Sequence, residues 1–127
     1  MPFMLKIQWE IKAGREADFR ANQAALCKVM LEHPGVICYH AYYPSQRVSQ
    51  WTEIYATDEA FAAHLANDQG KGPLATVIDA CDKITCQCWG DLNAGSKKLL
   101  ADFGTTYHET ATNAFVLNPR ADRDSRI

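Results

Sequence analysis

Four residues near the middle of the chain could together carry out acid–base chemistry. Trp51, Glu53 and Tyr55 are spaced two apart in a stretch of strand-like composition, so their side chains lie on one face. His64 follows on the apolar stripe of a helical stretch, which we expect to fold back over that face. The imidazole and the carboxylate can then meet in a mostly dry cavity. Burial raises the pKa of such a carboxylate and the attraction lowers it, a balance typical of acid–base sites.

The chemistry that this pair would support is proton removal from a phenol. A phenol must lose a proton before its electron-rich anion can pass an electron to dioxygen, and a base within hydrogen-bond distance is enough. Aromatic neighbours, Trp51, Tyr55 and Phe61, would hold a flat substrate and exclude water. The alternative is structural: His64 and Glu53 satisfy each other and fix the helix on the sheet.

Asn22 is a further candidate for binding substrate. It stands between Phe19 and Leu26 on the inward stripe of the first predicted helix. A buried amide needs partners, and an amide in a cavity could bind a substrate oxygen. The alternative is a bond to nearby backbone. His40 and Tyr42 share a strand face, and we favour a place for them at a subunit contact.

The five cysteines do not form an evident metal site. Cys86 and Cys88 share one strand face, but zinc needs two further ligands. Cys38 is expected on the opposite edge strand of the sheet, so no four-ligand set follows within one chain. Cys27 and Cys81 have the character of small core residues. We therefore expect no metal.

The pattern of apolar residues predicts four strands and three helices. Strands with period-two alternation or β-branched and aromatic composition are predicted at 3–11, 36–43, 47–56 and 83–89. A helix is predicted over 15–32 and ends at Pro34-Gly35. A second helix begins after the N-cap Thr57, and a further helix runs over 74–81. Turn residues at 44–46 join the two middle strands into a hairpin.

This β-α-β-β-α-β order over residues 3–92 predicts an α+β, ferredoxin-like fold. Its four-stranded antiparallel sheet would have helices on one face only. In the two middle strands, apolar and aromatic residues occur at both odd and even positions, which face opposite sides of the sheet. Both sheet faces therefore need to be covered. We therefore predict a homodimer packed sheet to sheet.

The chain is expected to form one domain over residues 1–93 with an extension over 94–127. Residues 94–103 can form a short helix. Residues 105–119 are irregular but too apolar for a free tail, so we expect them to dock on the body or on a partner subunit. Residues 120–127 are polar and are expected to fray.

Composition excludes some partners and favours a compartment. The 127 residues are 47% hydrophobic, and a formal net charge of −2 gives no broad attraction to nucleic acid or acidic membranes. The first residues, MPFMLK, show no basic region before a long apolar run, and no stretch is long enough to span a bilayer. We expect a cytoplasmic protein with reduced thiols.

Residues 51–65 resemble the signature of the antibiotic biosynthesis monooxygenase domain; they read WTEIYATDEAFAAHL. Glu53, Tyr55, Ala60 and His64 carry this resemblance. The stretch HPGVICY at 33–39 is similar to the segment that opens the second strand in that family. The resemblance implies a dimeric α+β barrel. It also implies relatedness to small oxygenases that oxidise quinols or anthrones with dioxygen, without metal or flavin.

Three functional hypotheses follow from the resemblance. The first is a cofactor-independent monooxygenase of a quinol, phenolic or anthrone-type aromatic, with His64 as base or hydrogen-bond donor and Glu53 orienting it. The second is a non-catalytic dimeric module that binds a small hydrophobic ligand. The third is a heme protein. The heme-degrading branch of this superfamily holds iron at a position that falls here on Gly72, Pro73 and Leu74, none of which can ligate it.

Overall fold

The computed structural model describes residues 2–68 and 70–109. Its elements follow the predicted order and continue beyond it: β1 (Phe3–Ile11), α1 (Glu16–Leu31), β2 (Val36–Ser45), β3 (Val48–Tyr55), α2 (Asp58–Asp68), α3 (Pro73–Asp79), β4 (Cys81–Trp89), α4 (Ala94–Leu99), the short 3₁₀ helix η1 (Ala101–Phe103) and β5 (Thr105–His108). The predicted β-α-β-β-α-β order is therefore confirmed, with boundaries shifted by a few residues.

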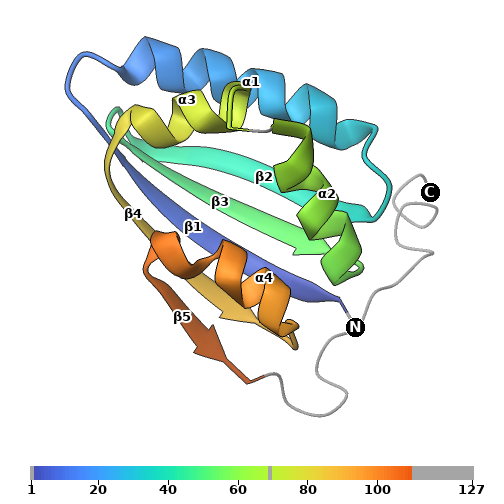
Figure 1. The fold of residues 1–127 in the computed structure, drawn as a ribbon. Helices are drawn as coiled ribbons and strands as arrows, with labels where there is room; N and C mark the ends of the chain where they lie inside the picture. Colours follow the sequence, from blue (N-terminus) through green and yellow to red (C-terminus); the bar gives the residue numbers. More distant parts are fainter. Residues whose placement is uncertain (1, 69, 110–127) are drawn as a thin grey trace, which may run out of the picture.

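The sheet has the strand order β2-β3-β1-β4-β5. The pairs β2–β3, β3–β1 and β1–β4 are antiparallel, as in the ferredoxin-like fold. Because β1 and β2 lie on either side of β3, α1 must cross over the sheet, and α2 with α3 makes the second crossover from β3 to β4. All helices in the described part lie over the same face (Figure 1).

The fifth strand was not predicted. Residues 105–108 were expected to be irregular, but they pair in parallel with β4 from Cys86–Thr105 to Trp89–His108. The sheet is therefore mixed and five-stranded, and β4 is not an edge strand. Four residues with no apolar alternation carry no strand pattern of their own, so the pairing depends on α4 returning the chain beside β4. The remainder of the predicted extension, beyond residue 109, lies outside the described residues.

Local chemistry explains where α2 begins. The Thr57 hydroxyl accepts a hydrogen bond from the Ala60 amide at 3.2 Å, which confirms the predicted N-cap. Gly35, which follows α1, has a φ of +83°, and a Cβ there would lie 2.6 Å from the Cβ of Ala60. Only glycine combines that backbone conformation with so close an approach.

The predicted hairpin turn lies later than expected. The turn residues Pro44 and Ser45 belong to β2, and the chain reverses at residues 46–47. β2 is an edge strand, where the missing N–H of Pro44 does not break the sheet.

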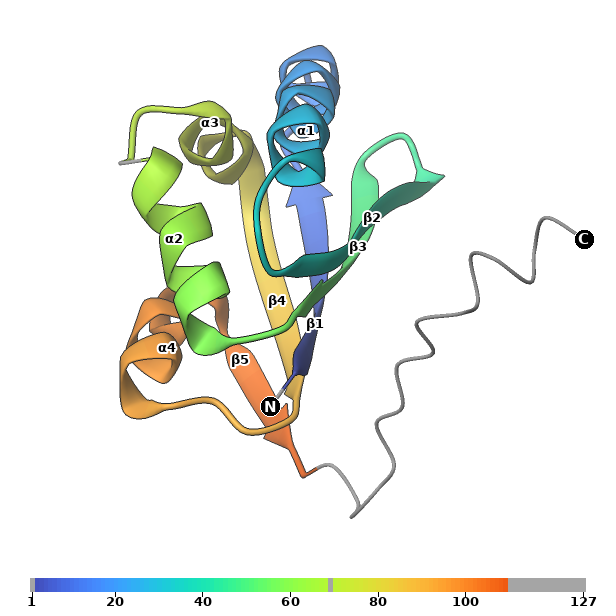
Figure 2. The same ribbon diagram turned by 90° about the vertical axis from the view of Figure 1, so that its right-hand side faces the viewer.

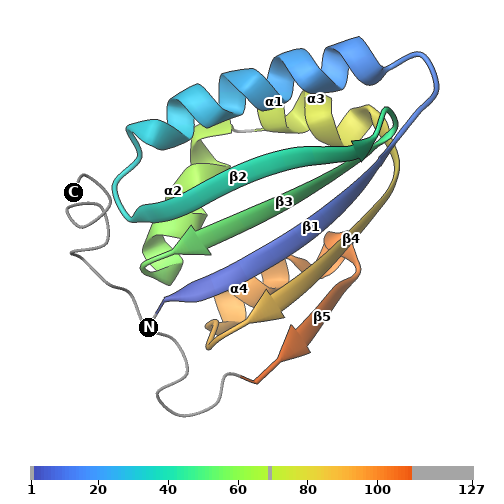
Figure 3. The same ribbon diagram turned by 180° about the vertical axis from the view of Figure 1, so that it is seen from behind.

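The core lies between the sheet and the helices. Alternate residues of β1, namely Phe3, Leu5, Ile7, Trp9 and Ile11, are buried on this face. Figure 2, turned by 90°, shows the helices on one side of the sheet. Figure 3 shows the molecule from behind, where no helix covers the opposite face of the sheet. No helix in the described part of the chain is long and apolar enough to cross a membrane.

The uncovered face is more polar than the two-sided apolar pattern predicted. A row of hydrogen bonds crosses it from Tyr42 on β2 through Gln50 on β3 to Gln8 on β1. Tyr42 is 45% exposed, and Trp89 stacks on His108 at the other side of the same face. A groove of about 400 Å³ runs over this surface.

Candidate functional site

A small apolar cavity lies between the sheet and the helical layer. Its walls come from β1, β3, α2, α3 and the segment formed by α4 and η1, and they comprise Leu5, Ile7, Trp9, Glu53, Phe61, His64, Leu65, Leu74, Leu100 and Phe103. Its volume is about 20 Å³, enough for roughly one water-sized molecule. Glu53 and His64, the two residues predicted to be catalytic, are therefore both in its wall.

Glu53 is a buried carboxyl with an unusual ionisation. Its side chain is 3% exposed, and its Oε2 atom accepts a hydrogen bond from the Tyr55 hydroxyl at 2.7 Å. Burial raises the pKa of Glu53 to about 7, while the neighbouring hydroxyls of Tyr55 and Tyr39 lower it. The carboxyl therefore exchanges its proton close to neutral pH.

Tyr39 lies beside Glu53 on the neighbouring strand, where the two residues are register partners. Its hydroxyl is buried and has no hydrogen-bond partner of ordinary geometry among the described residues. Burial raises the pKa of Tyr39 well above its usual value, and the nearby Glu53 carboxylate raises it further. The carboxyl thus faces two tyrosines, of which only Tyr55 makes a well-formed hydrogen bond to it.

His64 is held by aromatic rings rather than by the carboxylate. It is 4% exposed, stacks on Tyr55 with ring centroids 6.2 Å apart, and meets Tyr39 edge-on at 5.8 Å. Burial lowers the pKa of His64 to about 4, with the nearby His33 acting in the same direction. The imidazole is therefore neutral at pH 7. Between the described side chains of His64 and Glu53 no hydrogen bond forms, so the expected direct pair is absent.

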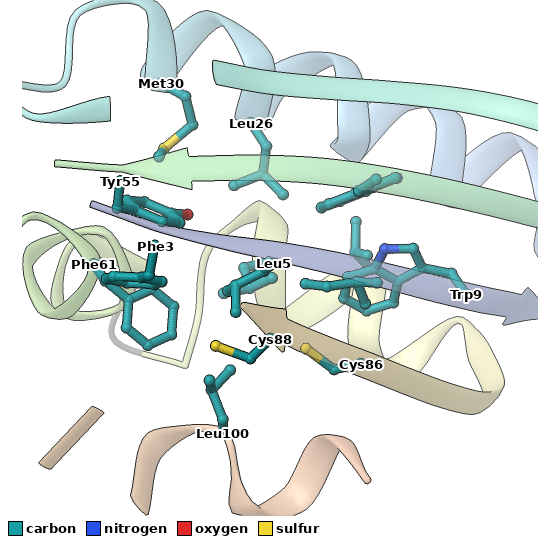
Figure 4. Close-up of a cluster of buried hydrophobic side chains, with 14 of the residues drawn as sticks. Phe3, Leu5, Trp9, Leu26, Met30, Tyr55, Phe61, Cys86, Cys88 and Leu100 are labelled. Carbon is teal, nitrogen blue, oxygen red and sulfur yellow. The ribbon is translucent and has the colours of Figure 1, made fainter. Parts of the chain in front are cut away.

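Aromatic side chains pack around Glu53 and His64. Phe61 is in the cavity wall and packs edge-on against Phe3 at 5.7 Å and Tyr55 at 5.3 Å. Figure 4 shows Tyr55, Phe3 and Phe61 at one end of the buried cluster and Trp9 at the other, with Leu5 between them. Of the aromatic residues predicted around the substrate, Phe61 lines the cavity, while Tyr55 packs beside it in the core.

Trp51 is buried and packs against residues of the cavity wall without lining the cavity itself. Its indole nitrogen donates to the Ser49 hydroxyl at 2.9 Å, and its ring lies 4.6 Å from that of Trp9 and 5.7 Å from that of Tyr39. It supports the residues that line the cavity and is not itself among them.

Asn22 is not brought to the cavity. It is half-buried on α1, and its side-chain nitrogen donates to the backbone oxygen of Asp18, one turn earlier, at 2.8 Å. This is the backbone-bonded alternative weighed for Asn22 from the sequence. His40 and Tyr42 stack on each other with ring centroids 5.7 Å apart. Tyr42 lines the groove of the uncovered face, away from the cavity.

Cys86 and Cys88 belong to the packed core. Both are buried, and burial raises the pKa of Cys86 to about 12 and that of Cys88 to about 11, so both remain thiols at neutral pH. Within residues 2–68 and 70–109, no group of three or more His, Cys, Asp or Glu side chains is placed to hold a metal ion. The expected absence of a metal remains a prediction.

Sequence reasoning did not find the residues that close the cavity. Leu100 follows α4 and is 2% exposed, while Phe103, the last residue of η1, packs edge-on against Trp9 at 6.4 Å. The segment is anchored by Asn93, whose amide donates to Asp58 on α2 and whose side chain caps α4. The sequence predicted a short helix over residues 94–103 but not its position beside the cavity.

The fold is shared with several solved structures, some of which are described as oxygenases or monooxygenases. MupZ from Pseudomonas fluorescens matches with a TM-score of 0.74 at 16% identity, over 94% of this chain and 97% of that one. SnoaB from Streptomyces nogalater, a cofactor-independent oxygenase solved as its N63A mutant, matches with a TM-score of 0.58 at 15% identity, over 73% and 95%. A further antibiotic biosynthesis monooxygenase matches with a TM-score of 0.63 at 12% identity, over 72% and 99%.

These matches confirm the resemblance to antibiotic biosynthesis monooxygenase domains at the level of the fold. No protein-family model matches the sequence, and the search of curated proteins gives no match. The chain therefore has the ferredoxin-like architecture of these domains, and its chemistry must be argued from its own residues.

Proposed function

We propose that this protein is a cofactor-independent monooxygenase that oxidises a quinol, phenolic or anthrone-type aromatic with dioxygen. The observation that carries the proposal is Glu53, a buried carboxyl with a pKa raised to about 7 in the wall of an aromatic-lined cavity. A base is most effective when its pKa lies near the working pH. The fold shared with SnoaB, described as a cofactor-independent oxygenase, supports the same reaction class.

In the proposed reaction Glu53 removes the proton that holds the substrate in its unreactive form. The resulting phenolate or carbanion passes one electron to dioxygen, and the substrate radical and superoxide then combine to form a C–O bond. The peroxide takes back the proton held by Glu53. Loss of the second hydrogen of the same carbon as a proton then breaks the O–O bond, so that one oxygen remains as a carbonyl group and the other leaves as water. The organic anion supplies the electrons, so the proposal includes neither metal nor flavin.

The structure favours a division of roles that differs from the one expected. With a pKa lowered to about 4, His64 is a weak proton acceptor, whereas Glu53 is a better one. We therefore assign Glu53 as the base and His64 as a neutral hydrogen-bonding group beside the substrate. Trp51, Tyr55 and Phe61 shape the surroundings, and we assign Asn22 no contact with substrate.

The cavity must expand before it can admit an aromatic ring. At about 20 Å³ it is far smaller than the roughly 300–1,000 Å³ of typical ligand pockets. Leu100 and Phe103 stand on a short helical segment at the surface, so displacement of this segment is the smallest change that enlarges the cavity. Closure afterwards would exclude water from the reacting anion.

Oxygen consumption with a panel of hydroquinones and anthrones tests the proposal. We expect uptake above the uncatalysed rate, reduced by about 100-fold or more in Glu53→Gln, because general bases contribute roughly 10²–10⁴ in rate. The matched control is Glu59→Gln, which removes an exposed carboxylate from α2. A folded Glu53→Gln variant with wild-type oxygen uptake would contradict the assignment.

The second candidate is a non-catalytic module that binds a small hydrophobic ligand. The small, largely apolar cavity is the observation that favours it. Saturable binding of an aromatic ligand with no oxygen uptake above background would select this function. In either case we propose a reducing, cytoplasmic setting, which the five free cysteines support.

We also propose that the uncovered sheet face packs against a second copy of the chain. The groove over this face and the exposed Tyr42 support a partner there. In analytical ultracentrifugation we expect twice the mass of one chain for the wild type and a single-chain mass for Thr52→Arg, which places a charge in the groove. Ala62→Arg, on the exposed side of α2, should remain dimeric. A monomeric wild type would refute this proposal.

A further inference from the structure

Trp9 carries a hydrogen-bond donor that no described residue accepts. The residue is 1% exposed and stands in the cavity wall, yet its indole nitrogen is buried without a hydrogen-bond partner within residues 2–68 and 70–109. A buried N–H without an acceptor destabilises the fold. Such groups are rare in folded proteins and call for an explanation.

The neighbouring tryptophan shows that this chain can satisfy an indole in the same core. Trp51 donates to the Ser49 hydroxyl at 2.9 Å, although Ser49 is itself fully buried. The centroid of the Trp51 ring is only 4.6 Å from that of the Trp9 ring. The Trp51 indole therefore has a buried hydroxyl as its acceptor, whereas the Trp9 indole has none among the described residues. Of the two, it is Trp9 that lines the cavity.

The surroundings of Trp9 suit an aromatic ligand with an oxygen acceptor. Phe103 lies edge-on to the Trp9 ring at 6.4 Å, and the walls nearby are otherwise aliphatic or aromatic. Glu53 and the neutral His64 line the same cavity, Glu53 from the strand beside that of Trp9 and His64 from α2. A ring that displaces Phe103 would therefore share one cavity with an indole and a proton acceptor.

We propose that the indole N–H of Trp9 binds the carbonyl or phenolic oxygen of an aromatic ligand in this cavity. The inference rests on the proposed function for the place of the ligand, and it adds the residue that binds the ligand's oxygen. Trp9 is thus a substrate-binding residue that also fixes which ring position faces Glu53.

Two small probes of nearly equal shape test this assignment. 1-Tetralone carries one carbonyl acceptor and no acidic hydroxyl, and tetralin is the corresponding hydrocarbon. Titration calorimetry without oxygen should give tighter binding of 1-tetralone than of tetralin to the wild type. Trp9→Phe keeps an aromatic ring but removes the N–H, so the ratio of the two affinities should fall about fivefold, as one net hydrogen bond predicts.

The matched control is Trp89→Phe, which removes an indole N–H from the uncovered face, where Trp89 stacks on His108. This variant should keep the wild-type affinity ratio. An unchanged affinity ratio in Trp9→Phe would overturn the proposal. The indole N–H of Trp9 would then be explained by a contact with the π face of the Trp51 ring. Failure of the wild type to bind 1-tetralone would overturn it as well.

A second measurement does not depend on the variant folding well. In the wild type, the indole N–H resonance of Trp9 should move downfield on addition of 1-tetralone and stay in place with tetralin. Because neither probe reacts with dioxygen under these conditions, the result is independent of catalysis. Loss of the Trp9 effect with oxygen uptake intact would refute this inference alone, whereas the reverse result would refute only the oxygenase.

Discussion

At the scale of single residues, the ionisation of Glu53 is set by two opposed influences. Burial raises its pKa, and the hydroxyl of Tyr55, which donates to Oε2 at 2.7 Å, lowers it. A hydrogen bond to the carboxylate stabilises the charged form, so it brings the pKa back toward the neutral range. In the proposed reaction Tyr55 would therefore act through Glu53, as a positioning residue.

Replacement of Tyr55 by Phe removes this hydrogen bond and keeps the ring. We expect the pKa of Glu53 to rise above about 7, so the acidic limb of the rate–pH profile should move to higher pH. Because a smaller fraction of the carboxyl would be ionised, the rate at pH 7 should fall while that at pH 9 is largely retained. The profile of oxygen uptake between pH 5 and 9 measures this shift. An equal loss at every pH would mean that Tyr55 has only a packing role.

The sequence predicts the face of these residues better than their partners. Period-two spacing correctly places Trp51, Glu53 and Tyr55 on one side of β3. It does not say that Glu53 would bond to Tyr55, two positions along the same strand, rather than to His64. That choice depends on side-chain rotamers and on how far α2 stands from the sheet, which a pattern of apolar residues does not encode.

At the scale of elements, the segment of α4 and η1 lines one side of the cavity, and we propose that it gives access to it. Its polar contacts with neighbouring elements include a bond from Asn93 to Asp58 and one from Thr105 to the Leu100 backbone oxygen at 2.9 Å. Tyr107 on β5 also donates to the Lys97 backbone oxygen at 3.5 Å. The main apolar contacts come from Leu100 and Phe103, which both face the cavity. A short element held in this way can move without unfolding the sheet.

Truncation of Phe103 should open the cavity. We expect Phe103→Ala to increase the association rate of 1-tetralone several-fold, because the ring that covers Trp9 is removed. Stopped-flow fluorescence measures this rate. Leu99→Ala is the matched control, since Leu99 is on α4 but 42% exposed. If both variants associate at the wild-type rate, the ligand enters by another route.

The elements themselves differ in how far the sequence determines them. The N-cap Thr57 and the alternation in β1 are local signals, and both elements were predicted. β5 was missed because its four residues pair with β4 only after the chain has folded back through α4. Parallel pairing of so short a strand is a property of the tertiary structure.

At the scale of the whole molecule, Glu53 and His64 couple the stability of the fold to pH in opposite directions. The pKa of His64 is lowered from 6.5 to about 4 in the folded chain. Between these two pH values the imidazole binds a proton in the unfolded chain but not in the folded chain. Stability from this group is lost as the pH falls from 6.5 to 4. The pKa of Glu53 is raised from 4.5 to about 7, so the folded chain keeps a proton that the unfolded chain releases. Stability from this group is lost as the pH rises from 4.5 to 7.

The two effects nearly cancel in the wild type, and single variants should separate them. Each shift corresponds to about 3 kcal/mol, from about 1.4 kcal/mol per pKa unit. In urea unfolding we expect Glu53→Gln to lose about 3 kcal/mol relative to wild type between pH 7 and 4.5, and His64→Leu to gain about as much. Glu59→Gln should follow the wild type. Parallel profiles for Glu53→Gln and His64→Leu would show that neither group is buried as the fold requires, and the proposed base would then lose its physical basis.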